Sequence, residues 1–134
     1  MIKRILLIED HDDFRDTVRD FLKTQDPELE IFEADCGESG IVQALKEKPD
    51  IVLMDIRLPN ANGIETAGDI KKHLPECKII VLTMFATESF RKIFHTSDIM
   101  AYLGKGELYE KLMPLVHQIF KTKHLAKAKE RKDL

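Results

Sequence analysis

Residues 51–63 read IVLMDIRLPNANG. The first four are apolar without alternation, which is the pattern of a strand buried on both faces rather than of a strand with one wet face. Asp55 follows this run directly, and the proline, asparagines and glycine after it indicate a loop. The stretch therefore predicts a central parallel strand that ends in a carboxylate.

Four other short runs of β-branched and aliphatic residues flank this strand along the chain, and longer segments with helical periodicity separate them. Strict alternation predicts an α/β fold, a (βα)5 doubly wound parallel five-stranded sheet with helices on both faces, because each parallel connection needs a right-handed crossover. The predicted strands cover Arg4–Ile8, Ile31–Ala34, Ile51–Met54, Lys78–Leu82 and Met100–Leu103.

The helices are predicted from apolar residues spaced three or four positions apart. Pro75 ends the third helix. Pro114 lies inside the fifth pattern, so we expect a kink there or a regular start delayed to about Met113. The predicted faces are Phe14, Val18, Phe21 and Leu22; Ile41, Val42, Leu45 and Lys48; Ile64, Ala67, Ile70, Lys71 and Leu74; Phe90, Ile93 and Phe94; and Leu108, Leu112, Leu115, Val116, Ile119 and Phe120.

The bulk properties indicate an ordinary globular chain. Its 134 residues fit one domain, and 43% are hydrophobic and 34% charged. A net charge of −3 gives no reason to expect nucleic acid as the partner of the body. No apolar run approaches the roughly 20 residues that cross a bilayer, and the N-terminus lacks a signal-peptide pattern. We therefore expect a cytoplasmic location and no membrane partner.

Two further patterns bear on organisation. Cys36 and Cys77 lie far apart without a CxxC motif or a Cys/His cluster, which indicates reduced thiols, and the histidines show no metal-ligand spacing. Residues 123–134 are rich in lysine and arginine. We expect one domain over residues 1–122, followed by a basic C-terminal extension or linker over 123–134.

Polar groups follow the predicted strands at one edge of the sheet. Glu9 and Asp10 follow the first strand, Asp55 the third, Thr83 the fourth and Lys105 the fifth. Ligands of open α/β sheets bind at this edge. Like charges about 4 Å apart repel by on the order of 4 kcal/mol at an effective dielectric near 20, and a divalent cation relieves that repulsion. Oxygen ligands without cysteine or histidine suit Mg²⁺.

A carboxylate beside Mg²⁺ can attack a phosphoryl group, as in enzymes that form an aspartyl phosphate. The metal ion, Lys105 and Thr83 would stabilise the charge on the phosphoryl oxygens. The sequence therefore predicts phosphoryl chemistry at Asp55.

This constellation resembles the receiver domain of two-component response regulators over about residues 3–120. The strand ending in Asp55 and its loop are similar to the family's phosphoacceptor segment. The spacings also agree, with 45 residues from Asp10 to Asp55, 28 from Asp55 to Thr83 and 22 from Thr83 to Lys105. The local sequences IEDH, LTM and AYLGK are similar to the NarL/FixJ-type subfamily. The resemblance implies the flavodoxin-like receiver fold.

The resemblance implies a role for each acidic residue. Asp55 would accept a phosphoryl group from a sensor histidine kinase or a small phosphodonor. Asp10 would bind Mg²⁺, with Glu9 binding directly or through water. The main-chain carbonyl of Arg57 would supply another ligand. Beyond Mg²⁺, no cofactor is expected.

The remaining site residues would carry the switch. Lys105 would pair with the phosphoryl group, and Thr83 would bond one of its oxygens. Tyr102 occupies the aromatic position that turns inward when the threonine moves. Pro59 and Gly63 would shape the loop after the phosphoacceptor, where glycine permits backbone angles that other residues resist.

Three larger side chains would flank the phosphoryl group. Met84 stands where many family members have a small residue, and Arg57 and Phe85 lie two positions after Asp55 and Thr83. Our hypothesis is that they shield the acyl phosphate and slow its hydrolysis.

The resemblance also implies how the signal leaves the domain. The expected surface is the fourth helix, fifth strand and fifth helix, residues 89–120, or the face of the first and fifth helices, which would bind an output domain, a protein partner or a second copy. NarL/FixJ-type regulators carry a DNA-binding module after a linker. The chain is therefore either the amino-terminal part of a transcriptional regulator or a stand-alone receiver, and it would reach DNA only through a domain absent from this chain.

Three other classes of protein fit the sequence less well. A haloacid-dehalogenase-type enzyme would need a second aspartate where Arg57 stands, so we expect self-phosphorylation and slow autodephosphorylation but no enzyme. A flavodoxin-like electron carrier would need a phosphate loop where residues 9–13 are acidic. A phosphorylation-independent interaction scaffold would be expected to lack Asp10, Asp55 or Lys105.

Overall fold

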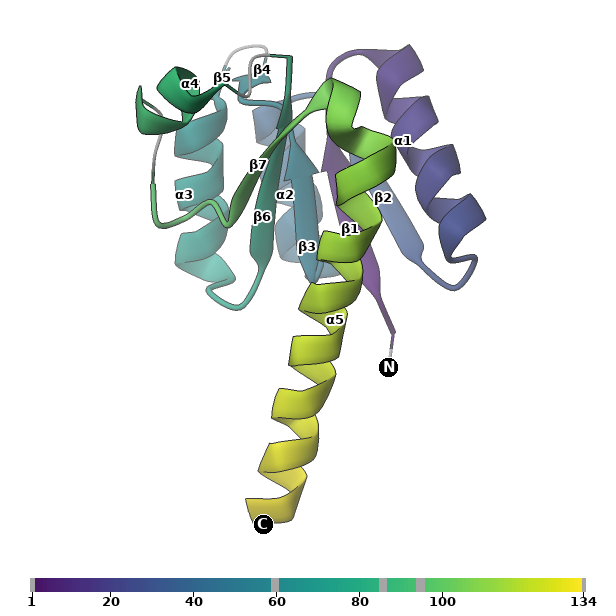
Figure 1. Ribbon diagram of the computed structural model, residues 1–134. Coiled ribbons are helices and arrows are strands. Elements are labelled where there is room, and N and C mark those ends of the chain that lie inside the picture. Colours follow the sequence, from purple (N-terminus) through teal and green to yellow (C-terminus); the bar gives the residue numbers. More distant parts are fainter. Residues whose placement is uncertain (1, 59–60, 85–86, 94–95, 134) are drawn as a thin grey trace.

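A five-stranded sheet forms the centre of the fold, with the strand order β2-β1-β3-β6-β7, and all four strand pairings are parallel (Figure 1). The computed structural model describes residues 2–58, 61–84, 87–93 and 96–133. The predicted fold class is confirmed. The strands of the sheet are β1 Arg4–Ile8, β2 Glu30–Ala34, β3 Ile51–Met54, β6 Lys78–Thr83 and β7 Ala101–Gly104.

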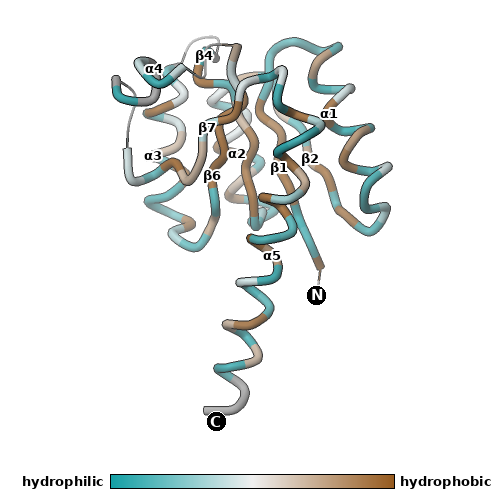
Figure 2. The backbone as a smooth tube through the Cα atoms, viewed as in Figure 1, coloured by the Kyte–Doolittle hydropathy of each residue, from teal (hydrophilic) through white to brown (hydrophobic). Residues whose placement is uncertain are grey.

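Helices cover both faces of the sheet. α1 (Asp12–Gln25) and α5 (Leu108–Asp133) pack against one face, and α2 (Gly37–Glu47) and α3 (Gly63–His73) against the other. The four residues of β3 are buried and contribute alternately to the two cores, as a strand with two apolar faces must. Figure 2 shows the strands as the most hydrophobic part of the chain.

Three short elements surround the carboxyl ends of the strands. A small antiparallel hairpin, β4 (Arg57–Leu58) with β5 (Ala61–Asn62), follows β3 and was not predicted. α4 (Glu88–Ile93) follows β6, and the 3-10 turn η1 (Lys105–Glu107) leads from β7 into α5. The apolar face predicted for the fourth helix, Phe90, Ile93 and Phe94, lies outside the described side chains.

The buried face of α2 differs from the prediction. Val42 and Leu45 are 62% and 42% exposed, whereas the residues that face the core are small: Gly37, Gly40 and Ala44. A Cβ atom at Gly40 would lie 2.5 Å from Cδ1 of Ile8, so glycine is what lets the helix approach β1. Lys48, predicted on the apolar face, instead ends the helix in a left-handed conformation with φ 49°.

Of the two outcomes expected at Pro114, a kink or a delayed start, the delayed start is wrong, because α5 begins at Leu108. Leu108 and Leu112 are both buried, and their packing stabilises the turns that precede Pro114. The carbonyl that loses its partner at the proline belongs to exposed Glu110, where water can bond it.

The second half of α5 projects beyond the sheet (Figure 1) and is mostly hydrophilic (Figure 2). Where it leaves the body, Lys123 pairs with the carboxylate of Asp50. The other oxygen of that carboxylate accepts a 2.9 Å hydrogen bond from the backbone N–H of Arg4. Asp50 thus ties α5 to the amino ends of β1 and β3. None of the described helices combines the length and hydropathy that a bilayer span requires.

Both cysteines are free thiols in different surroundings. Burial raises the pKa of the Cys77 thiol to about 12. A raised pKa reduces the thiolate fraction at pH 8, and the thiolate is the reactive form. We predict that Cys36→Ser protein, in which Cys77 is the remaining cysteine, resists a thiol reagent when native and reacts with one equivalent in urea. Rapid reaction of the native variant would contradict the burial of Cys77.

Candidate functional site

The strand register places the polar residues side by side. Ile8 of β1 lies opposite Met54 of β3, so the next residues, Glu9 and Asp55, leave adjacent strands at the same level. Their backbone N–H groups continue the sheet, with the Asp55 N–H donating to the Ile8 carbonyl at 3.2 Å. Two predicted site residues therefore meet because of the register of the sheet.

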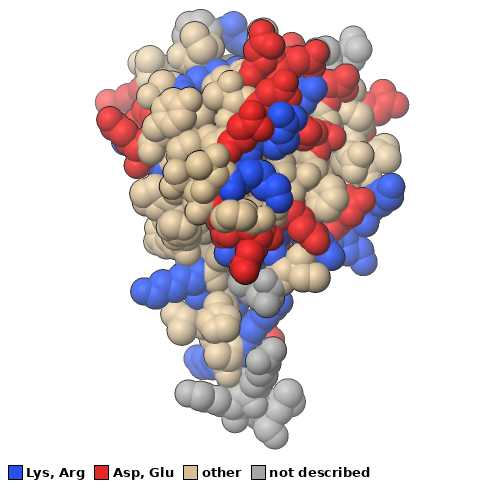
Figure 3. All heavy atoms as spheres, turned by 90° about the vertical axis from the view of Figure 1, so that its right-hand side faces the viewer, with Lys and Arg blue, Asp and Glu red and all other residues tan. Residues whose placement is uncertain are grey.

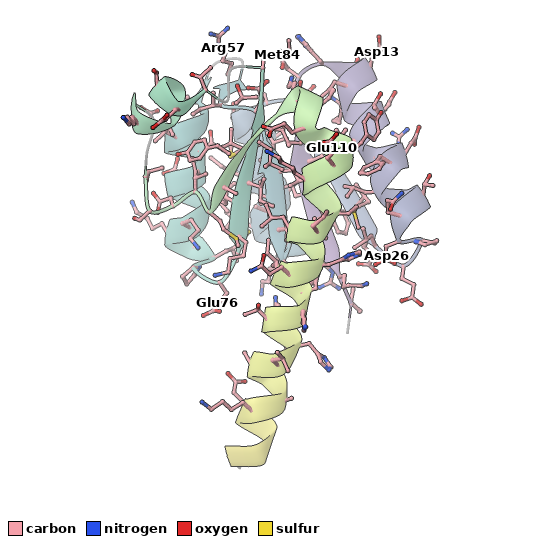
Figure 4. The ribbon with its side chains drawn as sticks, in the orientation of Figure 1. Asp13, Asp26, Arg57, Glu76, Met84 and Glu110 are labelled. Atoms are coloured by element: carbon pink, nitrogen blue, oxygen red, sulfur yellow. The ribbon has the colours of Figure 1, made fainter. Side chains whose placement is uncertain are left out.

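The same register brings the last strands to this edge. Thr83, the final residue of β6, lies opposite Gly104 of β7, and Lys105 follows. Thr83 is 1% exposed. In Figure 4, Arg57, Met84 and Asp13 lie together at one end of the molecule, whereas Asp26 and Glu76 lie toward the other.

Lys105 joins the two carboxylates. Its ammonium nitrogen lies 2.8 Å from Oε1 of Glu9 and 3.0 Å from Oδ2 of Asp55. Their side chains are 11%, 7% and 10% exposed, so solvent screens these contacts weakly. One ammonium thus bridges two carboxylates and reduces the repulsion between them.

The pKa shifts agree with this arrangement. Burial raises the pKa of Glu9 above its usual range, and the hydrogen bond and charge of Lys105 oppose the increase without cancelling it. For Lys105, burial alone would lower the pKa, but hydrogen bonds to Glu9 and Asp55 outweigh it and the pKa is raised. The lysine therefore stays charged at neutral pH.

The backbone after β3 fixes the other oxygen of Asp55. Oδ1 accepts a 3.0 Å hydrogen bond from the N–H of Arg57. The loop is held in turn by Gly63, whose N–H donates to the Ile56 carbonyl at 2.9 Å. Both oxygens of the Asp55 carboxylate consequently have fixed directions.

Gly63 acts differently from the prediction. It does not adopt left-handed angles but opens α3. A Cβ atom there would lie 2.6 Å from Cα of Ile56 and 3.0 Å from the Asp55 carbonyl oxygen, so close backbone approach is the constraint. Pro59 and Phe85, also named in the sequence, lie outside the described residues.

Candidate metal-ligand atoms gather at the end of β1. Candidate ligand atoms of Glu9, Asp10 and His11 lie within 4.8 Å of one another, with Glu9 buried and the other two exposed. Carboxylate oxygens suit Mg²⁺. The Asp55 carboxylate lies near that of Glu9, because both pair with the Lys105 ammonium. The carboxylates at this edge therefore fit a Mg²⁺ ion. Acidic side chains also gather near this end in Figure 3.

The first turn of α1 supplies two residues that the sequence reasoning missed. The ring of Phe14 lies 4.4 Å from the Lys105 ammonium, and the guanidinium of Arg15 donates a 2.6 Å hydrogen bond to the Glu9 carbonyl. The cavity that they line beneath Glu9 and Asp55 is only about 10 Å³. An arginine one turn after the acidic pair was the available signal.

Tyr102 occupies β7 beside the site. It is half-buried and packs against the core that includes Ile99. Burial raises the pKa of its hydroxyl, and a backbone hydrogen bond with Thr96 opposes the shift. The ring therefore lies partly inside the fold and connects β7 with the segment before it.

The family model of the response regulator receiver domain matches residues 5–117. The chain belongs to this family. Among its relatives, the response regulator GacA of Pseudomonas aeruginosa is 30% identical over 120 residues, which is 90% of this chain and 56% of GacA. The transcriptional regulatory protein YxjL of Bacillus subtilis is 34% identical over 130 residues, 92% of this chain and 60% of YxjL. The receiver domain thus spans less than two thirds of these relatives.

Solved receiver structures agree with the fold. TrrA of Thermotoga maritima, in complex with Mg²⁺–BeF, is 28% identical with a TM-score of 0.78, covering 87% of this chain and 98% of TrrA. A DNA-binding response regulator of the LuxR family from Staphylococcus aureus is 25% identical with a TM-score of 0.69, covering 89% and 97%. The predicted family and the NarL/FixJ-type subfamily are confirmed. The receiver domain is a signalling module, often the amino-terminal part of transcriptional regulators, and the scaffold alternative gains no support.

The shared ammonium makes a prediction for stability. Lys105→Met leaves the Glu9 and Asp55 carboxylates without their shared cation. Removing one partner of a buried ion pair lowers the free energy of unfolding by about 3 kcal/mol or more. Asp55→Asn should lower the free energy of unfolding much less. Lys105 keeps its ion pair with Glu9, and the repulsion between the two carboxylates is removed. Urea unfolding at pH 7 without Mg²⁺ measures both variants. A Lys105→Met protein as stable as the wild type would contradict the bridging role.

Proposed function

We propose that Asp55 is the phosphoacceptor of this receiver domain and that its phosphorylation switches a partner-binding surface. The observation that carries the proposal is the Asp55 carboxylate itself. It lies at the carboxyl edge of the sheet with one oxygen on the Arg57 N–H and the other on Lys105. A nucleophile held in this way meets a phosphodonor in a fixed orientation.

The transfer follows from these contacts. An oxygen of Asp55 attacks the phosphorus atom, and the bond from phosphorus to the donor breaks. The electron pair leaves with the donor, as acetate from acetyl phosphate or as the imidazole of a sensor histidine kinase, which takes up a proton. Lys105 then pairs with the new phosphoryl oxygens, and Thr83 donates its hydroxyl to one of them.

Mg²⁺ would be held by Glu9, Asp10, Asp55 and the main-chain carbonyl of Arg57. When bound, this ion neutralises charge on the phosphoryl oxygens during transfer. The support is the pair of carboxylates, Glu9 and Asp10, at the end of β1, together with the Mg²⁺–BeF complex of the related TrrA. Glu9 and the phosphoacceptor Asp55 both pair with Lys105. Binding of the metal ion and of the phosphoryl group would therefore change the ion pairs of that lysine.

We further propose that Thr83 and Tyr102 carry the change outward. Thr83 ends β6 and Tyr102 lies in the neighbouring strand β7. Movement of the threonine toward a phosphoryl oxygen would draw the tyrosine further inward. The affected surface would be α4, β7 and α5, or the α1/α5 face, as a site for an output domain, a protein partner or a second copy.

The whole protein would be a cytoplasmic regulator phosphorylated by a sensor histidine kinase. The chain spans 56% of the length of GacA and 60% of that of YxjL. This partial coverage supports the proposal that the chain is the amino-terminal part of a transcriptional regulator. Residues 1–122 would form the receiver domain. Residues 123–134 would form the basic extension or linker, and the continuation of α5 to Asp133 favours a helical extension.

Autodephosphorylation would be slow. Met84 is 71% exposed, and Arg57 lies at the same end of the molecule (Figure 4). Side chains of this size would cover the phosphoryl group from attacking water. The decay of the phosphoprotein after the donor is removed measures this directly.

The function is tested by intact mass after incubation with acetyl phosphate. We expect the wild type to gain one phosphoryl group in the presence of Mg²⁺ and no adduct with EDTA, because the metal neutralises the transferring group. Asp55→Ala should gain none, and Asp13→Ala, which removes an exposed carboxylate at the same end, serves as the matched control and should react. An equal adduct on Asp55→Ala would overturn the assignment.

A further inference from the structure

We propose that Arg15, in the first turn of α1, is a positioning residue for the Mg²⁺ site, acting through the main-chain carbonyl of Glu9. This inference rests on the function proposed above. Arg15 is none of the predicted ligands, and its guanidinium reaches the site only through the backbone.

The guanidinium connects three elements. Nη1 donates to the Glu9 carbonyl at 2.6 Å, at the end of β1. Nη2 donates to Oδ1 of Asp12 at 2.7 Å, at the start of α1. Nε lies 3.4 Å from Oε1 of Glu33, on β2, as an ion pair without hydrogen-bond geometry, and the side chain is 16% exposed. The planar fork of arginine suits such a multiple contact, because its donors have fixed directions.

The carbonyl that Arg15 binds belongs to the peptide group joining Glu9 to Asp10. Rotation of that peptide would swing the two side chains relative to each other. The Glu9 carboxylate is already fixed by Lys105, whereas Asp10 is exposed, so the direction of Asp10 depends on the backbone.

The direction in which Mg²⁺ affinity changes when Arg15 is replaced distinguishes a positioning role from simple charge repulsion. Arg15 is a cation near the site, so its charge alone repels Mg²⁺, and its removal would tighten binding. If Arg15 instead orients the ligands, its removal weakens binding. Losing an outer partner of metal ligands typically lowers affinity by 10–100-fold.

Arg19 provides a matched control on the same helix. It also pairs with Glu33, at 3.3 Å, and with Asp16 and Asp20, and among the residues that the structure describes no contact joins it to Glu9. Arg15→Gln and Arg19→Gln therefore change the net charge equally and both remove a contact to Glu33. Only the first removes the bond to the Glu9 carbonyl.

The test is a Mg²⁺ titration followed by two-dimensional amide NMR, whose peak dispersion also reports folding. We expect Arg15→Gln to raise the Mg²⁺ Kd about 10-fold, and Arg19→Gln to leave it unchanged or slightly lower. Arg15→Lys keeps the charge but cannot make all three contacts, so it should also weaken binding, and it replaces Arg15→Gln if that variant does not fold. Unchanged or tighter binding in the Arg15 variants overturns the positioning role. No Mg²⁺ binding by the wild type overturns the proposed function, and this inference with it.

Discussion

A single ammonium group, that of Lys105, holds Glu9 and Asp55 together at the carboxyl edge of the sheet. Two carboxylates this close and this buried would otherwise repel strongly. The lysine is itself held by the ring of Phe14 and by the turn that leads from β7 into α5. The site therefore brings together β1, β3, β7 and α1, and its geometry depends on the sheet being correctly assembled.

The ion pairs of Lys105 are compatible with the proposed phosphoryl transfer to Asp55. In the proposed function, a bound cation and a phosphoryl group would introduce charges of both signs next to Lys105, and each would replace one of the present contacts of the lysine. Such a rearrangement has a defined starting state, because Arg57 and Lys105 fix both oxygens of Asp55. In the proposed function, a change in these bonds would reach the outer surface through Thr83 and β7, which pair in the sheet.

The sequence predicted the parts of this arrangement that depend on simple patterns. Apolar runs ending in Glu9, Asp55 and Thr83 predicted the strands and their shared edge, because parallel register brings strand ends together. It did not predict the face of α2, since Gly40 and Ala44 carry no periodic hydrophobic signal, and it misjudged the start of α5, where buried Leu108 outweighs Pro114. The role of Arg15 depends on a backbone carbonyl, which residue types alone do not reveal.

The most direct test of the account is to locate the phosphoryl group chemically. Phosphorylated protein would be reduced with borohydride, which converts an aspartyl phosphate to homoserine, then digested and sequenced by tandem mass spectrometry. The account predicts homoserine at position 55 and unmodified aspartate at positions 10, 12 and 13. Homoserine at one of those positions, or none at position 55 in protein that carries a phosphoryl group, would contradict it.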